Sequence, residues 1–309
     1  MSTVAPPAPV PRRRARRTKL QRRQTRLGWL LLVPSLAVVA LVAIYPLGKT
    51  VYQSFTNQEF LAGLEPTKWV GFDNYHELIH DTIFRDTIVL TIKFTAITVA
   101  FEFVLGLIVA LVVNSKFKGR GLMRAVMLVP WAIPTVVAAK MWLWMLDDTY
   151  GVVNDLGMRT HLLSHPHAWI ADRSTQLGAV CAVDIWKTTP FVALLLLAGL
   201  QVIPNDLYEA AAVDGANKLQ QFWRITLPLL RPAILVTLIF RTLDALRVFD
   251  VFNVFFGNRL GAQSMAVYDQ GTIVQDGHVG YGAAVSVAIF LIISLFVVIY
   301  VTFVRVTEE

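Results

Sequence analysis

Charged residues and cysteine are both scarce in this chain of 309 residues. Only 16% of the residues are Asp, Glu, Lys or Arg, whereas 55% are hydrophobic. A soluble globular protein carries roughly 25% charged residues, so this composition excludes an ordinary water-soluble enzyme. The single cysteine, Cys181, lies in an apolar run and excludes both an intramolecular disulfide and a Cys-based metal site.

The hydrophobic residues gather into six long segments. A helix that crosses a bilayer needs about 20 mostly apolar residues. Runs of that length occupy residues 28–48, 88–113, 125–146, 176–200, 232–256 and 281–304. The pattern predicts an all-α, polytopic membrane protein with six transmembrane helices, which together form one domain over residues 28–306.

The net charge of +7 comes from the N-terminal arm. Nine of the 28 Lys and Arg residues fall within residues 12–26. The arm, residues 1–27, is rich in Ala, Pro and Arg, and we expect it to be disordered. Because basic residues are enriched on the cytoplasmic side of membrane proteins, the arm and the loop 114–124 predict cytoplasmic N- and C-termini. The same count places the loop 201–231 in the cytoplasm. We read the arm as a topology signal near anionic lipid, not as a nucleic-acid-binding segment.

The cytoplasmic loop 201–231 contains the most specific pattern in the chain. Asp206 and Glu209 have the spacing of a capping box, which predicts a short helix over about 207–213. Gly215 can supply the backbone angles of a turn, and a second helical stretch is expected over about 217–224. The loop is therefore predicted to be a helical elbow at the cytoplasmic membrane face.

This loop resembles the EAA loop of ABC importer permeases. The fixed residues of that motif are matched with its spacing by Glu209, Ala210, Ala211, Gly215, Ile225, Leu227 and Pro228. The resemblance extends over about residues 27–306, and the order of helices is similar to the sugar permeases of the maltose, trehalose and glycerol-phosphate group. It implies that the motif residues, together with Asp214, couple the chain to a separate ATPase.

The resemblance also implies partners and a location. The chain is expected to be a transport subunit and not an enzyme, and to bind no cofactor, with ATP and Mg²⁺ held by two partner ATPase subunits. A second homologous permease and an external solute-binding protein that docks on the loops 49–87 and 257–280 complete the expected assembly. The location is the cytoplasmic membrane of a bacterium or archaeon.

Ionisable residues inside the predicted spans are the candidates for cargo binding, because charges at membrane depth usually pair or mark a transport pathway. Asp184, Lys187 and Thr188 share one helical face, and Arg241, Asp244 and Arg247 are expected to form a ridge on the next span. From the permease resemblance, Asp184, Thr188, Asp244 and Arg247 are predicted to line the cargo cavity. The alternative is that the charges only pair with one another along each helix, Asp184 with Lys187 or Arg241 with Asp244. Lys93, Glu102 and Lys140 are interpreted as interhelical pairs or as side chains that snorkel.

The charged and aromatic residues of the spans fit two kinds of cargo. A sugar, such as trehalose or maltose, is the first interpretation, with Trp186 or Phe191 as an aromatic that covers a ring face. A glycerol phosphate or polyol is the alternative. An ATP-independent secondary transporter is the competing class, although no internal repeat relates residues 28–146 to 176–304.

Overall fold

The computed structural model describes residues 19–60, 66–115 and 117–308, which divide into two compact units, 1–52 and 53–309. The first unit contains α1 (Lys19–Val39), a π-helical turn (Ala40–Ile44) and α2 (Tyr45–Gln53), which follow one another without a break. They correspond to the first predicted span. Of the predicted disordered arm, residues 1–18 lie outside the described residues, and residues 19–27 begin α1.

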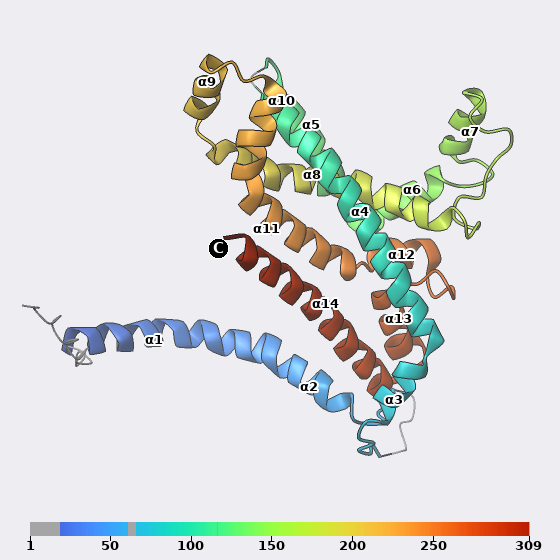
Figure 1. The fold of residues 1–309 in the computed structure, drawn as a ribbon. Coiled ribbons are helices and arrows are strands. Elements are labelled where there is room, and N and C mark those ends of the chain that lie inside the picture. The colour runs from blue at the N-terminus through green and yellow to red at the C-terminus, as the bar shows by residue number, and fades with distance from the viewer. Residues whose placement is uncertain (1–18, 61–65, 116, 309) are drawn as a thin grey trace, which may run out of the picture. The chain divides into compact units, whose positions relative to one another are not determined.

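The second unit is helical throughout its regular structure (Figure 1). No strand longer than an isolated bridge, Thr56 with Trp69, occurs in the described ranges. The helices are α3 (Asp73–His80), α4 (Thr82–Asn114), α5 (Arg120–Ala132), α6 (Thr135–Met145), α7 (Val152–Arg159), α8 (Gln176–Val202), α9 (Asn205–Val213), α10 (Lys218–Gln221), α11 (Leu227–Leu246), α12 (Asp250–Phe256), α13 (Met265–Gln270) and α14 (Val279–Glu308). Two π-helical turns, Phe222–Thr226 and Gly271–Gln275, complete them. The prediction of an all-α membrane protein is confirmed.

Five helical stretches among the described residues are long and apolar enough to cross a membrane, and a bent pair, α5 with α6, makes six. The predicted third span, 125–146, is therefore not one straight helix: its two halves meet at 88°. Pro134 explains the break, since the residue before a proline is pushed out of the helical region. Ile133 has the extended angles φ −71° and ψ 130°.

The fifth span also differs from the prediction. We expected one helix over 232–256, but α11 ends at Leu246 and α12 begins at Asp250. The Ser264 hydroxyl donates a hydrogen bond of 2.6 Å to the Val248 carbonyl, which the broken helix leaves without its usual partner. Arg247 lies at the end of α11, so the expected ridge of three charges has only Arg241 and Asp244 within the helix.

The core of the second unit follows α4 and α8. Buried side chains from the ends of α4 and α8 and the start of α11 form one cluster, and a second surrounds Phe94, Val180 and Phe252. The two helices approach closely at Gly106, where an added Cβ would lie 2.6 Å from Val192 Cγ1. Glycine is required there because any side chain would force the helices apart.

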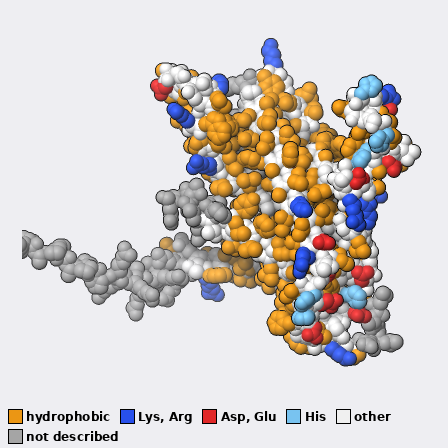
Figure 2. Space-filling model, turned by 45° about the vertical axis from the view of Figure 1, so that its right-hand side comes forward, with side chains coloured by type: hydrophobic (Ala, Val, Ile, Leu, Met, Phe, Trp, Pro, Cys, Tyr) orange, Lys and Arg blue, Asp and Glu red, His pale blue; other side chains and the backbone are white. Residues whose placement is uncertain are grey.

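Hydrophobic side chains cover much of the face that Figure 2 shows, while charged and histidine side chains gather mostly near its margins. On α4, for example, Val104 and Ile108 are more than half exposed in the isolated chain. Such a surface is typical of a protein that faces lipid or other membrane helices, because the bilayer core supplies no partners for polar groups.

Candidate functional site

The predicted coupling helix is α9, which ends in a Schellman motif. The Ala216 N–H donates to the Ala211 carbonyl (2.8 Å), and the Gly215 N–H donates to the Ala212 carbonyl (3.1 Å). This motif needs a residue in the left-handed region, and Gly215 has φ +81°. The turn predicted at Gly215 is therefore confirmed. Glycine suits this position because the two hydrogen bonds of the motif require a left-handed backbone there.

The capping box predicted at Asp206 and Glu209 is wrong. The helix begins at Asn205, directly after Pro204, and no side chain caps its first turn. A capping box occurs instead at α10, where Asn217 and Gln220 exchange side-chain to backbone hydrogen bonds of 2.9 and 2.8 Å. The second helical stretch of the elbow starts at this box.

Two polar contacts hold the two halves of the elbow together. The Tyr208 and Thr226 hydroxyls lie 3.0 Å apart, which connects α9 to the π-helical turn before α11. Gln221 is buried and donates to the carbonyl of Ala216 (3.2 Å). The Gln221 amide also donates to the carbonyl of Tyr208 (3.5 Å), 13 positions away, and the Tyr208–Thr226 contact joins residues 18 positions apart. These longer contacts connect α9 to the second half of the elbow and limit its rotation.

The residues of the EAA pattern divide between two surfaces. Glu209 and Ala210 are exposed, whereas Ile225 packs against the buried cluster formed by the ends of α4 and α8. Leu227 and Pro228 are half-buried. A hollow of about 360 Å³ between these surfaces is lined by Ala211, Asp214, Gly215, Ala216, Gln220, Gln221, Arg224 and Ile225. One half of the pattern thus anchors the elbow, and the other half is available to a partner.

All four predicted cargo residues line one cavity of about 410 Å³, which lies at the break between α11 and α12. A volume of this size is within the range of small-molecule sites. The lining consists of Trp131, Thr135, Asp184, Lys187, Thr188, Phe191, Phe240, Arg241, Asp244, Arg247, Val248, Phe249, Asp250 and Val251. The cavity therefore joins α5, α6, α8, α11 and α12.

Arg241 lies at the buried end of this cavity and contacts three carboxylates. Its guanidinium binds both oxygens of Glu102 on α4, with Nη2 3.0 Å from Oε1. It also binds Asp184 on α8, and Nη1 lies 3.0 Å from Asp244 Oδ2. Of the two pairings expected along single helices, Arg241 with Asp244 is present. Asp184 pairs with Arg241 and not with Lys187.

The sequence left open whether Glu102 snorkels or forms an interhelical pair, and it did not identify a partner. Glu102 and Arg241 are 139 positions apart, so no local spacing relates them. The available signal was chemical: a carboxylate in the middle of an apolar span requires a cationic partner. Lys93 and Lys140, which were interpreted in the same way, are exposed and form none of the ion pairs found in the described ranges.

The aromatic residues of the cavity also differ from expectation. Trp131 and Phe191 stack with ring centroids 5.8 Å apart and an interplanar angle of 13°. Both line the cavity. Trp186, named as a ring-covering candidate, packs edge-on against Trp142 and is not part of the lining.

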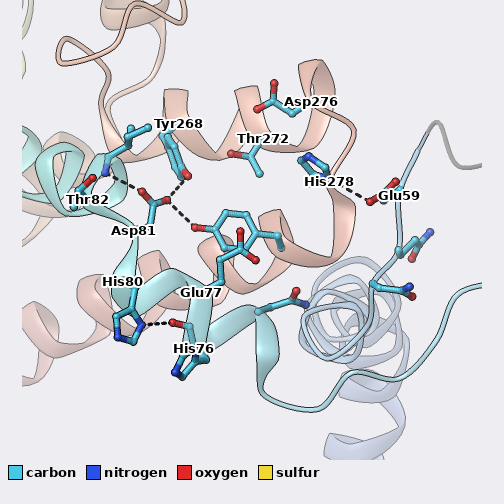
Figure 3. Close-up of a pocket in the computed structure, with 15 residues that line it drawn as sticks. Glu59, His76, Glu77, His80, Asp81, Thr82, Tyr268, Thr272, Asp276 and His278 are labelled. Atoms are coloured by element: carbon cyan, nitrogen blue, oxygen red, sulfur yellow. Dashed lines mark hydrogen bonds and ion pairs between the residues drawn. The ribbon is translucent and has the colours of Figure 1, made fainter.

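A second, outer pocket of about 740 Å³ lies among α3, the start of α4, α13 and α14 (Figure 3). Both of the external loops predicted for docking, 49–87 and 257–280, contribute to its lining. The ionisable side chains that line it are Glu59, His76, Glu77, His80, Asp81, Tyr268, Asp276, His278 and Tyr281, with no Lys or Arg among the described lining. No group of His, Cys, Asp or Glu in the described parts of the chain has the geometry to hold a metal ion.

Asp81 connects three elements at the edge of this outer pocket. Its Oδ1 caps α4 by accepting from the backbone N–H groups of Ile83 (2.8 Å) and Phe84 (3.1 Å). Its Oδ2 accepts from the hydroxyls of Tyr281 (2.7 Å) and Tyr268 (Figure 3). Burial alone would raise the pKa of Asp81, but the four hydrogen bonds outweigh it and lower the pKa below the ordinary value. Burial and Asp81 together raise the pKa of Tyr268 to about 12.

The chain is similar to known transport proteins in sequence. The family model described as "binding-protein-dependent transport system inner membrane component" matches residues 102–308. The trehalose/maltose transport system permease protein MalF of Thermococcus litoralis is 38% identical over 92% of this chain and 95% of its own length. The sulfoquinovosyl glycerol transport system permease protein SmoG of Agrobacterium fabrum is 39% identical over 90% of each chain.

The fold is shared with a solved structure as well. A chain of a bacterial ABC transporter involved in the import of the acidic polysaccharide alginate superposes with a TM-score of 0.81 at 23% identity, covering 94% of this chain and all of the other. The resemblance that the loop motif carried is thereby confirmed. The chain belongs to the family of binding-protein-dependent transport system inner membrane components, and it is a transport subunit of ABC importers and not an enzyme.

Proposed function

We propose that the chain is one of two permease subunits of an ABC importer that moves a sugar, a di- or oligosaccharide such as trehalose or maltose. The observation that carries this proposal is the 410 Å³ cavity between α8 and α11, the two spans that flank the coupling loop. Its carboxylates and guanidinium groups suit sugar hydroxyls because charge-assisted hydrogen bonds are strong. The stacked pair Trp131 and Phe191 offers an apolar face for a sugar ring.

The charges of the lining favour a neutral cargo. Three carboxylates, from Asp184, Asp244 and Asp250, stand beside three cations, from Lys187, Arg241 and Arg247. Arg241 is moreover shared with Glu102, behind the cavity. An anionic cargo, such as a glycerol phosphate, would need an excess of cations to offset its loss of water. It stays the second candidate because Arg247 is exposed in the cavity and one relative transports, by its name, a sulfoquinovosyl glycerol.

The coupling role is proposed for α9. Glu209 and Ala210 face outward, and the small side chains of Ala210 and Ala211 would let the surface of an ATPase approach the helix backbone. ATP and Mg²⁺ would be bound by two such ATPase subunits and not by this chain. A second, homologous permease would present a second elbow, because a symmetric ATPase pair has two sockets.

The orientation of the chain in the membrane determines where an external solute-binding protein could dock. Both termini are proposed to be cytoplasmic, in the cytoplasmic membrane of a bacterium or archaeon. The outer pocket, which the loops 49–87 and 257–280 line together, is the proposed contact for an external solute-binding protein. A neighbour with this fold was solved in complex with a periplasmic protein that carries an alginate pentasaccharide. The solute-binding protein would deliver the sugar to the cavity.

The test is uptake in proteoliposomes that contain this chain with its partner permease, its ATPase and its binding protein. We expect ATP-dependent uptake of labelled trehalose or maltose and no uptake of glycerol 3-phosphate. Uptake of the phosphate alone would favour the anionic cargo. Uptake that proceeds without the ATPase, driven by an ion gradient, would contradict the importer and support a secondary transporter.

The proposed coupling contact has its own variant. Glu209→Arg reverses the charge of an exposed residue on α9, and we expect it to abolish uptake and the co-purification of the ATPase while insertion in the membrane continues. Asp206→Arg, the same reversal near the start of that helix, is the matched control and should retain most of the uptake. Normal transport by Glu209→Arg would contradict the coupling role of α9.

A further inference from the structure

The ion pair of Glu102 and Arg241 is more deeply buried than the cavity residues it adjoins. Glu102 is 0% and Arg241 2% exposed, whereas the Asp244 side chain is 68% exposed. A buried ion pair is often no more stabilising than apolar side chains of similar volume, because both charges lose their water. Fold stability alone therefore gives a weak reason for this pair, and its position next to the cavity suggests another.

The guanidinium of Arg241 has almost no capacity left for cargo. An arginine side chain has five N–H donors. Two of them are used by Glu102, one by Asp184 and one by Asp244. Although Arg241 lines the cavity, a sugar hydroxyl would find at most one N–H free. The carboxylates that Arg241 holds, those of Asp184 and Asp244, keep further acceptor capacity for sugar hydroxyls.

Glu102 does not belong to the cavity lining at all. It lies on α4, behind Arg241, and its two oxygens bind Nε and Nη2 in a bidentate arrangement. Such a fork fixes the plane of the guanidinium as well as its position. With Nε and one side of Nη2 engaged, Nη1 and the other side of Nη2 can only point toward Asp244 and Asp184.

We propose that Glu102 and Arg241 are positioning residues of the cargo cavity: Glu102 orients the guanidinium, and the guanidinium holds the Asp184 and Asp244 carboxylates ready for sugar hydroxyls. The inference rests on the proposed function of the cavity. The long-range geometry supports it, since Asp184 comes from α8 and Asp244 from α11, and Arg241 is the cation that contacts both. Because Asp244 is mostly exposed, its carboxylate would otherwise sample several rotamers, and ordering it on binding would weaken affinity.

A purely structural clamp is the competing explanation. The same contacts connect α4, α8 and α11, so the pair could serve only to hold the three helices together. The two roles differ in what they change. A clamp affects the amount of folded transporter and the maximal rate, whereas a positioning residue affects the concentration of sugar needed for half-maximal transport.

The test is Glu102→Gln in the complete reconstituted complex, with trehalose and maltose as probes. The amide keeps the size of Glu102 but turns an NH₂ group toward the guanidinium, so one charge-assisted contact is lost. We expect KM for the transported sugar to rise at least about tenfold, with the maximal rate per folded complex within about twofold of wild type. Asp86→Asn, a neutralisation on an exposed position of the same helix, is the matched control and should leave KM unchanged.

A double-variant cycle with Asp244→Asn separates the explanations further. If Glu102 acts through Arg241 on Asp244, the double variant should have a KM no higher than that of the worse single variant. Fold-changes that multiply, or a lower maximal rate with unchanged KM in Glu102→Gln, would overturn the positioning role. If the wild-type complex shows no ATP-dependent sugar uptake, the proposed function is overturned, and the inference with it.

Discussion

The proposed coupling loop and the proposed cargo cavity differ in how far apart along the chain their contacting residues lie. The loop takes its residues from one stretch, 201–231, and its decisive contacts join positions within 18 residues of one another. The cavity takes Asp184 and Arg241 from different spans, 57 positions apart, and depends on Glu102 from a third span, 139 positions from Arg241. The loop has exposed residues such as Glu209 and Ala210, whereas the cavity has buried charges directed at one another.

The difference explains what each region tolerates. A local motif such as the turn at Gly215 depends on backbone angles, so one substitution can disable it while the rest of the fold remains intact. A cluster of long-range ion pairs distributes its contacts over several helices, so single substitutions there are expected to change affinity by degrees. The following predictions test that contrast.

The largest effect is expected for Gly215→Pro. Proline has φ near −65° and no N–H, whereas Gly215 has φ +81° and donates to Ala212. The cost is about 3 kcal/mol or more, and we expect α9 to lose its end and ATP-dependent uptake to be lost. Gly215→Ala is the graded control: a Cβ meets no atom within 4 Å, so only the backbone penalty of about 1–2 kcal/mol applies. Equal uptake by both variants would contradict the role of the turn.

A smaller effect is expected for Trp131→Ala in the cavity. An aromatic platform contributes about 0.5–1.5 kcal/mol beyond its buried area, so KM for the sugar should rise roughly two- to twelvefold. The measurement is initial uptake against sugar concentration. Trp186→Ala removes an indole that packs on Trp142 outside the lining, and it should leave KM unchanged. A higher KM in Trp186→Ala than in Trp131→Ala would reverse the assignment.

The smallest effect is expected on thermal stability and concerns Asp269. The cavity carboxylates pair with Arg241, whereas Asp269 takes part in none of the ion pairs found among the described residues. Its Oδ2 accepts from the Ser286 hydroxyl (2.7 Å), and its buried Oδ1 has no partner in the described structure. Burial raises the pKa of Asp269 to about 6 from the ordinary 3.8. The folded state therefore holds this proton more tightly than the unfolded state, so stability declines as the pH rises from about 4 through 6.

Asp269→Asn should remove this part of the pH dependence. We expect the difference in Tm between variant and wild type, measured in detergent, to favour the variant by a few degrees at pH 7 and to vanish near pH 4. Ser286→Ala serves as the control: it removes the hydrogen bond that favours the charged form, so the decline should extend to higher pH. A Tm difference that is independent of pH would show that Asp269 is not the titrating group.

The positions of the spans could be predicted from hydrophobic runs alone. Of the two interruptions within the spans, only one could be predicted from the local sequence. The bend between α5 and α6 has a local cause in Pro134, so the signal was present in the sequence and was overlooked. The break at Arg247–Phe249 contains neither Pro nor Gly. It is stabilised by Ser264, which follows α12 and binds the Val248 carbonyl, and no window centred on residue 248 contains that information.

The candidate site shows the same division. The EAA pattern predicted the family and the helical elbow of loop 201–231 because its residue types are needed at fixed local spacings, although the capping residues within the elbow were assigned to the wrong helix. The four residues that the permease resemblance predicted for cargo binding do share a cavity. Their arrangement was not predictable: Arg241 binds Asp184 and Glu102 because helix packing brings α4, α8 and α11 together.

The scarcity of charge, the six apolar runs and the loop motif are properties of the chain that the sequence by itself determined, because hydrophobic length and local backbone requirements act over neighbouring residues. Only the tertiary structure decided which carboxylates share one guanidinium, where the fifth span breaks and that Trp131 and Phe191 face the cavity. These features depend on contacts between distant segments, and such contacts exist only after the helices have packed.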